Sequence, residues 1–368
     1  MRIRVIRFVV TVQSVLFLAH WFVYKTWTIF LADPDPQGIT ILAALMVLAS
    51  VSFVVATLIA HRYRGFFVSL LYRIAATWMG LFNFLFLAAC GAWVIYLGGR
   101  LFGRHPDRST IVAAMFGMAF LISLYGVINA RSVRVNRVSV KLPGLPHSWR
   151  GRNAALVSDV HLGHLNGRGF LRGIVSALQH LAPDIVFIVG DLYDGSRVNP
   201  EALVMPWKEL SVPFGSYFVT GNHEEFSDPA KYLAAVTRAG IRVLKSEKVT
   251  IDGLQIIGVQ YSDSTSPARF RSILEGAHLN GGPSILLSHV PHGLQIAEKA
   301  GISLLLSGHT HGGQIFPFTW LTARVFGEFS YGLKQFGKLM VYTSCGIGTW
   351  GPPLRVGTRP EIVLIELA

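Results

Sequence analysis

Side chains that bind divalent metal ions follow a series of short apolar runs in the C-terminal two thirds of the chain. The densest case is GHTHGGQ at 308–314, in which two imidazoles two residues apart come directly after the apolar run ISLLL. The same arrangement recurs where other apolar runs end, and the side chains concerned are Asp159, His161, Asp191, Asn222, His289, His309 and His311. Carboxylate, amide and imidazole groups in this number predict a metal centre.

The ligand types restrict which metals fit. The set mixes nitrogen and oxygen ligands and contains no thiolate. Such a mixture suits Mn²⁺, Fe or Zn²⁺ better than the all-oxygen sites of Ca²⁺ or Mg²⁺. Seven side chains exceed the needs of one ion that must also admit a substrate. We therefore predict two divalent metal ions about 3.5–4 Å apart that share a carboxylate, with Mn²⁺ as the expected metal and Fe or Zn²⁺ as alternatives.

The apolar runs alternate with helix-like stretches. NAALV, DIVFIV, SYFV, SILL and ISLLL are predicted to be buried strands, and stretches such as 169–181 and 229–240 to be helices. This alternation is typical of an α/β domain whose strands are buried on both faces. Ligand sites in such sheets lie beyond the carboxyl ends of the strands. Because each polar cluster follows a strand, all are expected at one sheet edge, where glycines allow the backbone to approach closely.

Residues 1–130 differ from the rest of the chain in being poor in charge. They contain ten Lys or Arg and three Asp or Glu, whereas residues 131–368 contain 23 and 17. Four apolar stretches reach the roughly 20 residues that cross a bilayer as a helix, at about 8–31, 39–60, 74–97 and 110–130. The first has the basic start of a signal peptide but no convincing small-residue cleavage site, so we interpret it as a retained anchor.

The distribution of Lys and Arg predicts the orientation in the membrane. Basic residues at the N-terminus, between the second and third stretches and after the fourth would all face the cytoplasm if the N-terminus is inside. Arg100, Arg104 and Arg108 in the third loop disobey this pattern, and the loss of one crossing would place the C-terminal domain outside. We predict a multi-pass protein of a bacterial-type inner (cell) membrane with its C-terminal domain in the cytoplasm. Cys90 and Cys345 lie in different regions and are not expected to pair.

Five motifs occur in order within residues 151–368: DVH, GDLYD, GNHE, the SH of SHVP, and GHTH. In this order and at predicted strand ends they resemble the signature blocks of the calcineurin-like metallophosphoesterases. The resemblance implies a four-layer α/β/β/α sandwich in residues 151–368. A bundle of about four transmembrane helices in residues 1–130 would precede it, with a linker and first strand in 131–150.

The resemblance also implies a role for each site residue. Asp159, His161 and His311 would hold the first metal, Asn222, His289 and His309 the second, and Asp191 both. His223 would protonate the leaving-group oxygen, and Asp194 would orient the His223 imidazole. A hydroxide bridging the metals would attack phosphorus in line with that oxygen. The charged residues expected to face solvent instead are Glu224, Glu225, Arg355 and Arg359.

The predicted activity is hydrolysis of a phosphoester or pyrophosphate bond by a membrane-embedded enzyme. The apolar stretches hold no acidic pairs or basic ladders that would indicate transport, so they are interpreted as an anchor. This favours a lipid-linked or membrane-adjacent substrate, and the UDP-2,3-diacylglucosamine hydrolases are similar proteins. A phosphodiesterase or phosphatase of soluble nucleotides, and a non-catalytic membrane scaffold or sensor, are the alternatives. Nucleic acid is not an expected partner, since no arginine-rich stripe favours it, and no oligomeric state is predicted.

Overall fold

The computed structural model describes residues 2–31, 35–226 and 228–368. The chain divides into two compact units. The first, called here the helical unit, comprises Met1–Ile128 with Gly351–Leu354, and the second, called the sheet unit, comprises Asn129–Trp350 with Arg355–Ala368.

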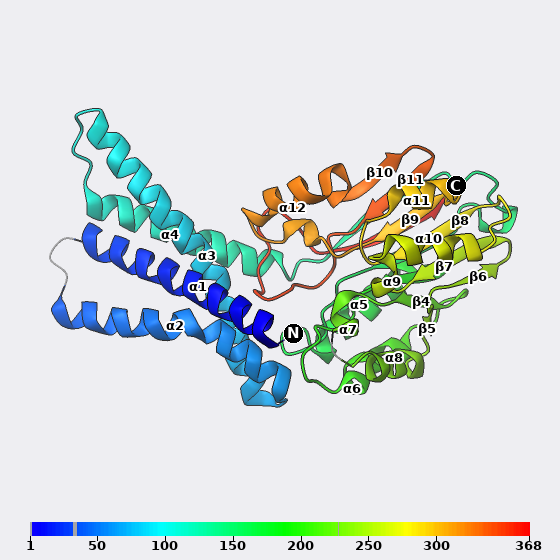
Figure 1. Cartoon of the computed structure of the whole chain (residues 1–368), viewed down its shortest axis with the longest axis horizontal. Coiled ribbons are helices and arrows are strands. Elements are labelled where there is room, and N and C mark those ends of the chain that lie inside the picture. The colour runs from blue at the N-terminus through cyan, green and yellow to red at the C-terminus, as the bar shows by residue number, and fades with distance from the viewer. Residues whose placement is uncertain (1, 32–34, 227) are drawn as a thin grey trace. The chain divides into compact units, whose positions relative to one another are not determined.

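Long helices drawn from blue to cyan in Figure 1 make up the helical unit, namely α1 Arg2–Phe30, α2 Pro36–Arg62, α3 Phe66–Leu101 and α4 Arg108–Asn129. Helices α1 and α3 pack together with small residues of α3 in their shared clusters: Ala89 belongs to the same buried cluster as Val23, and Ala92 to the same cluster as Phe30. Small side chains allow apolar helices to approach closely. The apolar stretches of the sequence therefore form helices that pack on one another.

The number of membrane-crossing helices is lower than the sequence predicted. Among the described residues, three helices are long and apolar enough to cross a bilayer, namely α2, α3 and α4. The prediction of four is therefore corrected to three. The stretch at 8–31 does form a helix, α1, but Gln13, His20 and Lys25 interrupt its apolar surface. Polar side chains of this kind weaken a transmembrane signal because each is costly to bury in hydrocarbon.

The sheet unit contains two six-stranded sheets. In spatial order, the first consists of β1 Arg134–Val140, β12 Glu361–Leu367, β2 Asn153–Val157, β3 Ile185–Val189, β4 Ser216–Val219 and β5 Arg242–Val243. The second consists of β10 Gly332–Phe336, β11 Leu339–Thr343, β9 Leu304–Ser307, β8 Ser284–Ser288, β7 Leu254–Val259 and β6 Glu247–Ile251. Strands β2 to β5 are parallel, as are β7, β8, β9 and β11, so their carboxyl ends share an edge in each sheet.

Helices connect the strands of the sheet unit. The α-helices are α5 Arg168–Leu181, α6 Pro200–Val204, α7 Asn222–Glu225, α8 Pro229–Arg238, α9 Tyr261–Ser264, α10 Pro267–Gly276, α11 Leu294–Lys299 and α12 Phe318–Phe326. The short 3₁₀ helices are η1 His147–Trp149, η2 Met205–Glu209, η3 His311–Gly313 and η4 Gly327–Ser330.

The hydrophobic core lies in three layers, because successive side chains of a strand point to opposite faces of its sheet. On β3, Phe187 joins the core between the two sheets, and Ile188 joins the core on the outer face. The outer core of the first sheet includes residues of α5, α6 and α8, and that of the second includes residues of α10 and α11. The order of layers is helix, sheet, sheet, helix, which confirms the predicted α/β/β/α sandwich.

Candidate metal centre

Every predicted metal ligand follows a parallel strand of the sheet unit. Strands β2, β3 and β4 of the first sheet and β8 and β9 of the second each end shortly before one or two of them. Asp159 and His161 follow β2, Asp191 follows β3, Asn222 follows β4, His289 follows β8, and His309 and His311 follow β9. The polar groups of two packed sheets therefore meet at adjoining edges.

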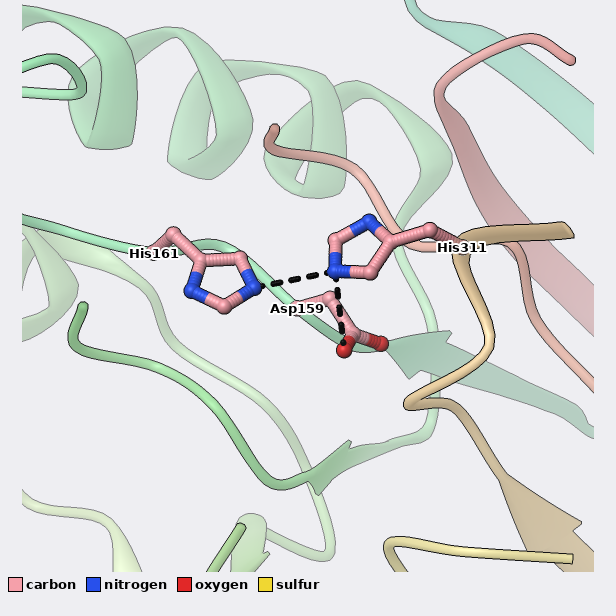
Figure 2. A group of neighbouring side chains, drawn as sticks. All are labelled: Asp159, His161 and His311. Atoms are coloured by element: carbon pink, nitrogen blue, oxygen red, sulfur yellow. Dashed lines mark hydrogen bonds and ion pairs between the residues drawn. The ribbon is translucent and has the colours of Figure 1, made fainter. Parts of the chain in front are cut away.

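Asp159, His161 and His311 form a first cluster of buried side chains, drawn in Figure 2. The Nε2 atoms of His161 and His311 lie 3.0 Å apart, and His311 Nε2 lies 3.5 Å from Asp159 Oδ1. All three candidate ligand atoms lie within 4.8 Å of one another. One ion could thus contact all three side chains.

Asp191, His289 and His309 form a second cluster. His289 Nε2 lies 3.2 Å from Asp191 Oδ2, 3.2 Å from His309 Nδ1 and 3.2 Å from Asn222 Oδ1. The same carboxylate oxygen of Asp191 lies 3.9 Å from His161 Nε2 in the first cluster. Asp191 is therefore placed to serve both clusters.

The backbone of this site is strained. Asp159, His161, Asp191, His309 and His311 all have positive φ, at 53°, 50°, 50°, 70° and 49°. Residues other than glycine rarely adopt this region, and such strain persists only where the surrounding structure over-determines it. Five of the seven predicted ligands share this conformation, which aims their side chains into a common volume.

Hydrogen bonds from the main chain hold the side chains in place. The Asp159 carboxylate accepts from the Ser158 hydroxyl and from the His309 amide, the latter at 3.1 and 3.0 Å. The Asp191 Oδ1 atom accepts from the His223 amide at 3.0 Å, which leaves Oδ2 for the clusters. His289 Nδ1 donates to the Val189 carbonyl at 2.8 Å, which leaves Nε2 free to bind. Contacts of this kind fix the orientation of metal ligands.

Burial keeps most of the imidazoles neutral. It lowers the pKa values of His161 and His309 to about 3, and that of His311 well below its usual value. Burial also raises the pKa of Asp159 to about 6. In the Asp191–His289 pair burial acts against both charges, but mutual attraction outweighs it, so the pKa of His289 rises to about 10 and that of Asp191 falls. A cation would replace the proton of His289.

These features fit divalent metal ions. Neutral imidazoles and carboxylates are the forms that bind metals. The ring nitrogens of His161 and His311 lie 3.0 Å apart, and those of His289 and His309 lie 3.2 Å apart. A cation bound by both nitrogens of a pair would stabilise this arrangement. Among the described side chains, the buried Nδ1 of His161 has no hydrogen-bond partner. The donor set thus suits two nearby cations.

His223 and Asp194 lie beside the clusters. His223 Nδ1 donates to the main-chain carbonyl of Asp194 at 2.8 Å, and the side chain is 19% exposed. The Asp194 carboxylate instead accepts from the amide and hydroxyl of Ser196, at 2.9 and 2.5 Å. Asp194 therefore contacts the imidazole through its carbonyl oxygen and not, as an acidic partner would, through its side chain. His223 Nε2 lies 4.0 Å from Asp191 Oδ2, and a ring nitrogen of His223 falls within 4.8 Å of ligand atoms of His161 and Asp191, so distance alone would allow His223 as a ligand.

The expectation that Glu224 faces solvent is wrong. Its buried carboxylate accepts hydrogen bonds from the amides of Asp191, Gly221 and Tyr193, at 3.0, 2.8 and 2.9 Å. Burial, together with the nearby Asp191 charge, raises the pKa of Glu224 to about 8. Glu224 thereby ties the loop after β3 to the loop after β4. The glutamate lies three residues after Gly221, at the N3 position of α7, from which its carboxylate accepts the amide of the N-cap residue. Its neighbour Glu225 is half-buried.

The expectation that Arg355 faces solvent is also wrong, whereas Arg359 is exposed. Arg355 is 0% exposed, and its Nη2 donates to the carbonyls of Cys345, Gly346 and Gly348 at 2.8, 3.1 and 2.6 Å. The same nitrogen lies 3.4 Å from His311 Nδ1. The amides of Ile347 and Gly348 donate to the carbonyls of Ser158 and Asp159. Arg355 thus links the loop at 345–348 to the first cluster.

Sheet order and site together define a class of α/β/β/α proteins with paired metal-ligand clusters at the strand ends. The family described as calcineurin-like phosphoesterase matches residues 153–313. A "Transmembrane protein with metallophosphoesterase domain" from Danio rerio is 34% identical over 71% of this chain and 63% of its own length. The protein of the same description from Bos taurus is 31% identical over 85% and 80%. An uncharacterized metallophosphoesterase from Aquifex aeolicus is 30% identical over 68% and 97%.

The chain belongs to the calcineurin-like metallophosphoesterase family, as its five motifs predicted. Members named as transmembrane proteins, together with the three apolar helices, also confirm a membrane protein. The chain spans slightly less than two thirds of the Danio rerio relative.

Gly308 tests how closely the backbone must approach the first cluster. A Cβ atom at this position would lie 1.7 Å from Ser158 Oγ and 2.3 Å from Asp159 Oδ2. We expect Gly308→Ala to displace Asp159 and to destabilise the fold by about 1–3 kcal/mol, as overpacking does. Thermal unfolding of the purified full chain measures the effect. Gly173→Ala is the control, because a Cβ there meets nothing within 4 Å. Equal melting temperatures for the two variants would contradict the expectation.

Arg355→Met removes the donor that serves the carbonyls at 345–348. Three buried carbonyls left unpaired cost about 1–3 kcal/mol each, so we expect the melting temperature of the full chain to fall by about 6 °C or more. Metal content after purification should fall as well, because the loop that supports Asp159 loosens. The matched control is Arg359→Met at an exposed position. A variant at 355 that behaves like this control would show that the guanidinium is dispensable.

Proposed function

We propose that the chain is a membrane-anchored phosphoesterase with two divalent metal ions that hydrolyses a phosphoester or pyrophosphate bond. The observation that carries this proposal is the position of the Asp191 carboxylate, whose Oδ2 lies between two clusters of donor atoms. A carboxylate shared between two ligand sets is the arrangement that places two ions close together. Mn²⁺ is the metal we expect, with Fe or Zn²⁺ as alternatives.

Each ion would take its ligands from one cluster. Asp159, His161 and His311 would hold the first ion, Asn222, His289 and His309 the second, and Asp191 both. When bound, such ions lower the pKa of a water molecule that can attack phosphorus and neutralise charge on the phosphoryl oxygens. The neutral state of His161, His309 and His311 leaves nitrogen lone pairs available for this binding.

His223 would act on the leaving group. Its Nδ1 proton is held by the Asp194 carbonyl, so Nε2 is the atom free to carry a second proton. The side chain is partly exposed, and it can reach a substrate. A protonated imidazole there would donate its Nε2 proton to the departing oxygen, as general acids do. Asp194 would position the ring through its main chain, so Asp194→Asn should matter less than a change at 223.

His223→Ala separates the general-acid role from a ligand role. We expect turnover of a glycerophosphodiester, whose alkoxide leaving group needs a proton to depart, to fall by about 10²–10⁴, while two metal ions per chain are retained. Elemental analysis of the Mn²⁺-loaded full chain measures the metal. Asp191→Asn is the comparison, because it should lose both metal and turnover. A loss of metal in His223→Ala as large as in Asp191→Asn would make His223 a ligand.

The membrane helices favour a substrate that is linked to a lipid or lies close to a bilayer. Helix α4 ends at Asn129 and β1 begins at Arg134. The chain between these two residues can extend over at most about 18 Å, at about 3.5 Å per residue. An acylated sugar nucleotide such as UDP-2,3-diacylglucosamine is one such substrate. Soluble nucleotides are the alternative. A metal-loaded full chain that hydrolyses neither kind of ester would instead support a non-catalytic scaffold or sensor.

We further propose that the sheet unit faces the cytoplasm of a bacterial-type cell. Whether the sheet unit lies on the same side of the membrane as the segment between α2 and α3 depends only on whether α3 and α4 cross. Both helices qualify as spans. Two crossings return the chain to the same side, whether or not α1 crosses. The segments that would share the inner side contain Arg62, Arg64, Arg73, Arg131, Arg134, Arg137 and Lys141, against Arg100, Arg104 and Arg108 on the other side. An excess of basic residues marks the cytoplasmic side.

Reporter fusions test this orientation. A reporter that works only in the cytoplasm, joined after Ala368, should be active, and one that works only outside should be silent. The same reporters inserted at Gly103, between α3 and α4, should give the opposite pattern, because one crossing separates the two positions. An active external reporter at Ala368 would place the sheet unit outside and exclude cytoplasmic nucleotides as substrates.

A further inference from the structure

An exposed apolar segment follows the His309–His311 loop directly. Helix α12 and the residue pair before it bury no large side chain, and five apolar residues are about half exposed or more. Phe316, Phe318, Trp320, Leu321 and Val325 are 51%, 52%, 63%, 50% and 66% exposed. Phe318, Leu321 and Val325 are spaced three and four residues apart, so they share one face of the helix. Contiguous apolar surface of this kind marks a binding site more often than chance exposure does.

This segment is fixed to the metal-ligand loop at both ends. A Cβ atom at Gly313 would lie 2.4 Å from the Cα of Thr319, so the start of α12 lies against the loop. After α12, the Thr310 hydroxyl donates to the Ser330 carbonyl at 2.8 Å. Between these points the Phe326 ring lies 6.3 Å from the His309 ring. The exposed stripe is therefore held beside the second cluster.

Further aromatic rings lie around His309. The Tyr261 ring is 6.4 Å from the His309 ring and 6.1 Å from that of His289. Phe226, which is 74% exposed, packs edge-on against Tyr261 at 6.0 Å. Two aromatic surfaces, one from α12 and one from the segments at 226 and 261, thus contact the same imidazole.

We propose that these surfaces form an apolar rim, comprising Phe226, Tyr261, Phe318, Leu321, Val325 and Phe326, that binds the hydrocarbon chain of a lipid phosphoester. The phosphate of that lipid would lie at the clusters. The inference rests on the proposed function and names its substrate class. A hydrocarbon chain on the rim would remove apolar surface from water on both partners, which is favourable in proportion to the area buried.

Two observations favour a lipid as the occupant. First, only residues 130–133 separate the end of α4 from β1, so the chain enters the sheet unit directly after a helix that can cross a bilayer. Second, Arg324 stacks over Trp320 at 5.5 Å on the flank of the stripe. An apolar stripe bordered by Trp and a basic residue is typical of helices that lie at a lipid–water interface.

Paired substrates test the rim through activity. Methyl p-nitrophenyl phosphate and hexadecyl p-nitrophenyl phosphate share a leaving group and differ only in the hydrocarbon chain. In the full chain, reconstituted in nanodiscs with Mn²⁺, the double variant Leu321→Ser with Val325→Ser should raise KM for the hexadecyl ester by about tenfold or more. Its kcat/KM for the methyl ester should stay within about twofold. Met205→Ser is the control, since Met205 is exposed on η2, which contacts the start of β4, and not its carboxyl end, through the hydrogen bond from Trp207 to Ser216.

A fluorescent label tests the rim without any activity. Leu321→Cys and Met205→Cys are each labelled with the same environment-sensitive dye, and native Cys90 and Cys345 are corrected for with unmodified chain. Spin-labelled lipids in the nanodisc should quench the dye at 321 at least twofold more than the dye at 205. Equal quenching, or quenching at neither position, overturns the proposal. A blue shift at 321 that depends on protein concentration, without lipid quenching, overturns it in favour of a second copy of the chain.

The two tests separate the rim from the proposed function. If neither ester is hydrolysed by the unmodified chain but the dye at 321 is quenched, the phosphoesterase proposal fails and lipid contact stands. If both esters are hydrolysed and the double variant affects them equally, the enzyme stands and the rim does not bind the chain of the substrate.

Discussion

The structure depends on bringing several buried imidazoles and carboxylates into one small volume at the edges of two sheets. Such a volume is unfavourable for the folded chain by itself, because burial opposes the charged form of every group in it. Only Asp191 and His289 retain opposite charges by mutual attraction, while His161, His309 and His311 are held neutral. Binding of cations would offset the free energy lost by burying these groups. The surrounding loops are therefore best understood as supports for this volume.

Those supports come from parts of the chain far apart in sequence. Glu224 joins the loops after β3 and β4 by accepting three main-chain amides. Arg355 gathers the carbonyls at 345–348, whose amides in turn hold the loop of Ser158 and Asp159. The Glu224 carboxyl group accepts hydrogen bonds from main-chain amides, and the Arg355 guanidinium donates hydrogen bonds to main-chain carbonyls. In both cases a buried polar side chain is satisfied by groups of the main chain and not by a ligand carboxylate.

The helical unit and the sheet unit follow different physical rules. Helix α2 has many exposed apolar side chains, among them Leu45, Leu48 and Leu58, as expected for a helix whose surroundings are hydrocarbon and not water. In the sheet unit the inner strands β2, β3, β4, β7, β8 and β9 are almost wholly buried, and many of the exposed apolar groups lie at α12 and around Trp350 and Phe226. Apolar exposure in the sheet unit therefore has a local cause near the site, whereas in the helical unit it is general.

Local patterns in the sequence were sufficient for the α/β class and for the placement of the seven ligand candidates at strand ends, whereas the four layers came from the resemblance of the five motifs to a known family. Apolar strands followed by Asp, Asn or His are short-range signals, and the carboxyl ends of parallel strands necessarily share an edge. Hydropathy was less decisive for α1, in which scattered polar residues offset a long apolar run. The burial of Glu224 and Arg355, and the contact of His223 with the Asp194 carbonyl instead of its carboxylate, needed the tertiary structure. These depend on which loops meet across the two sheets, and a charged residue in a turn looks the same in sequence whether water or main-chain dipoles surround it.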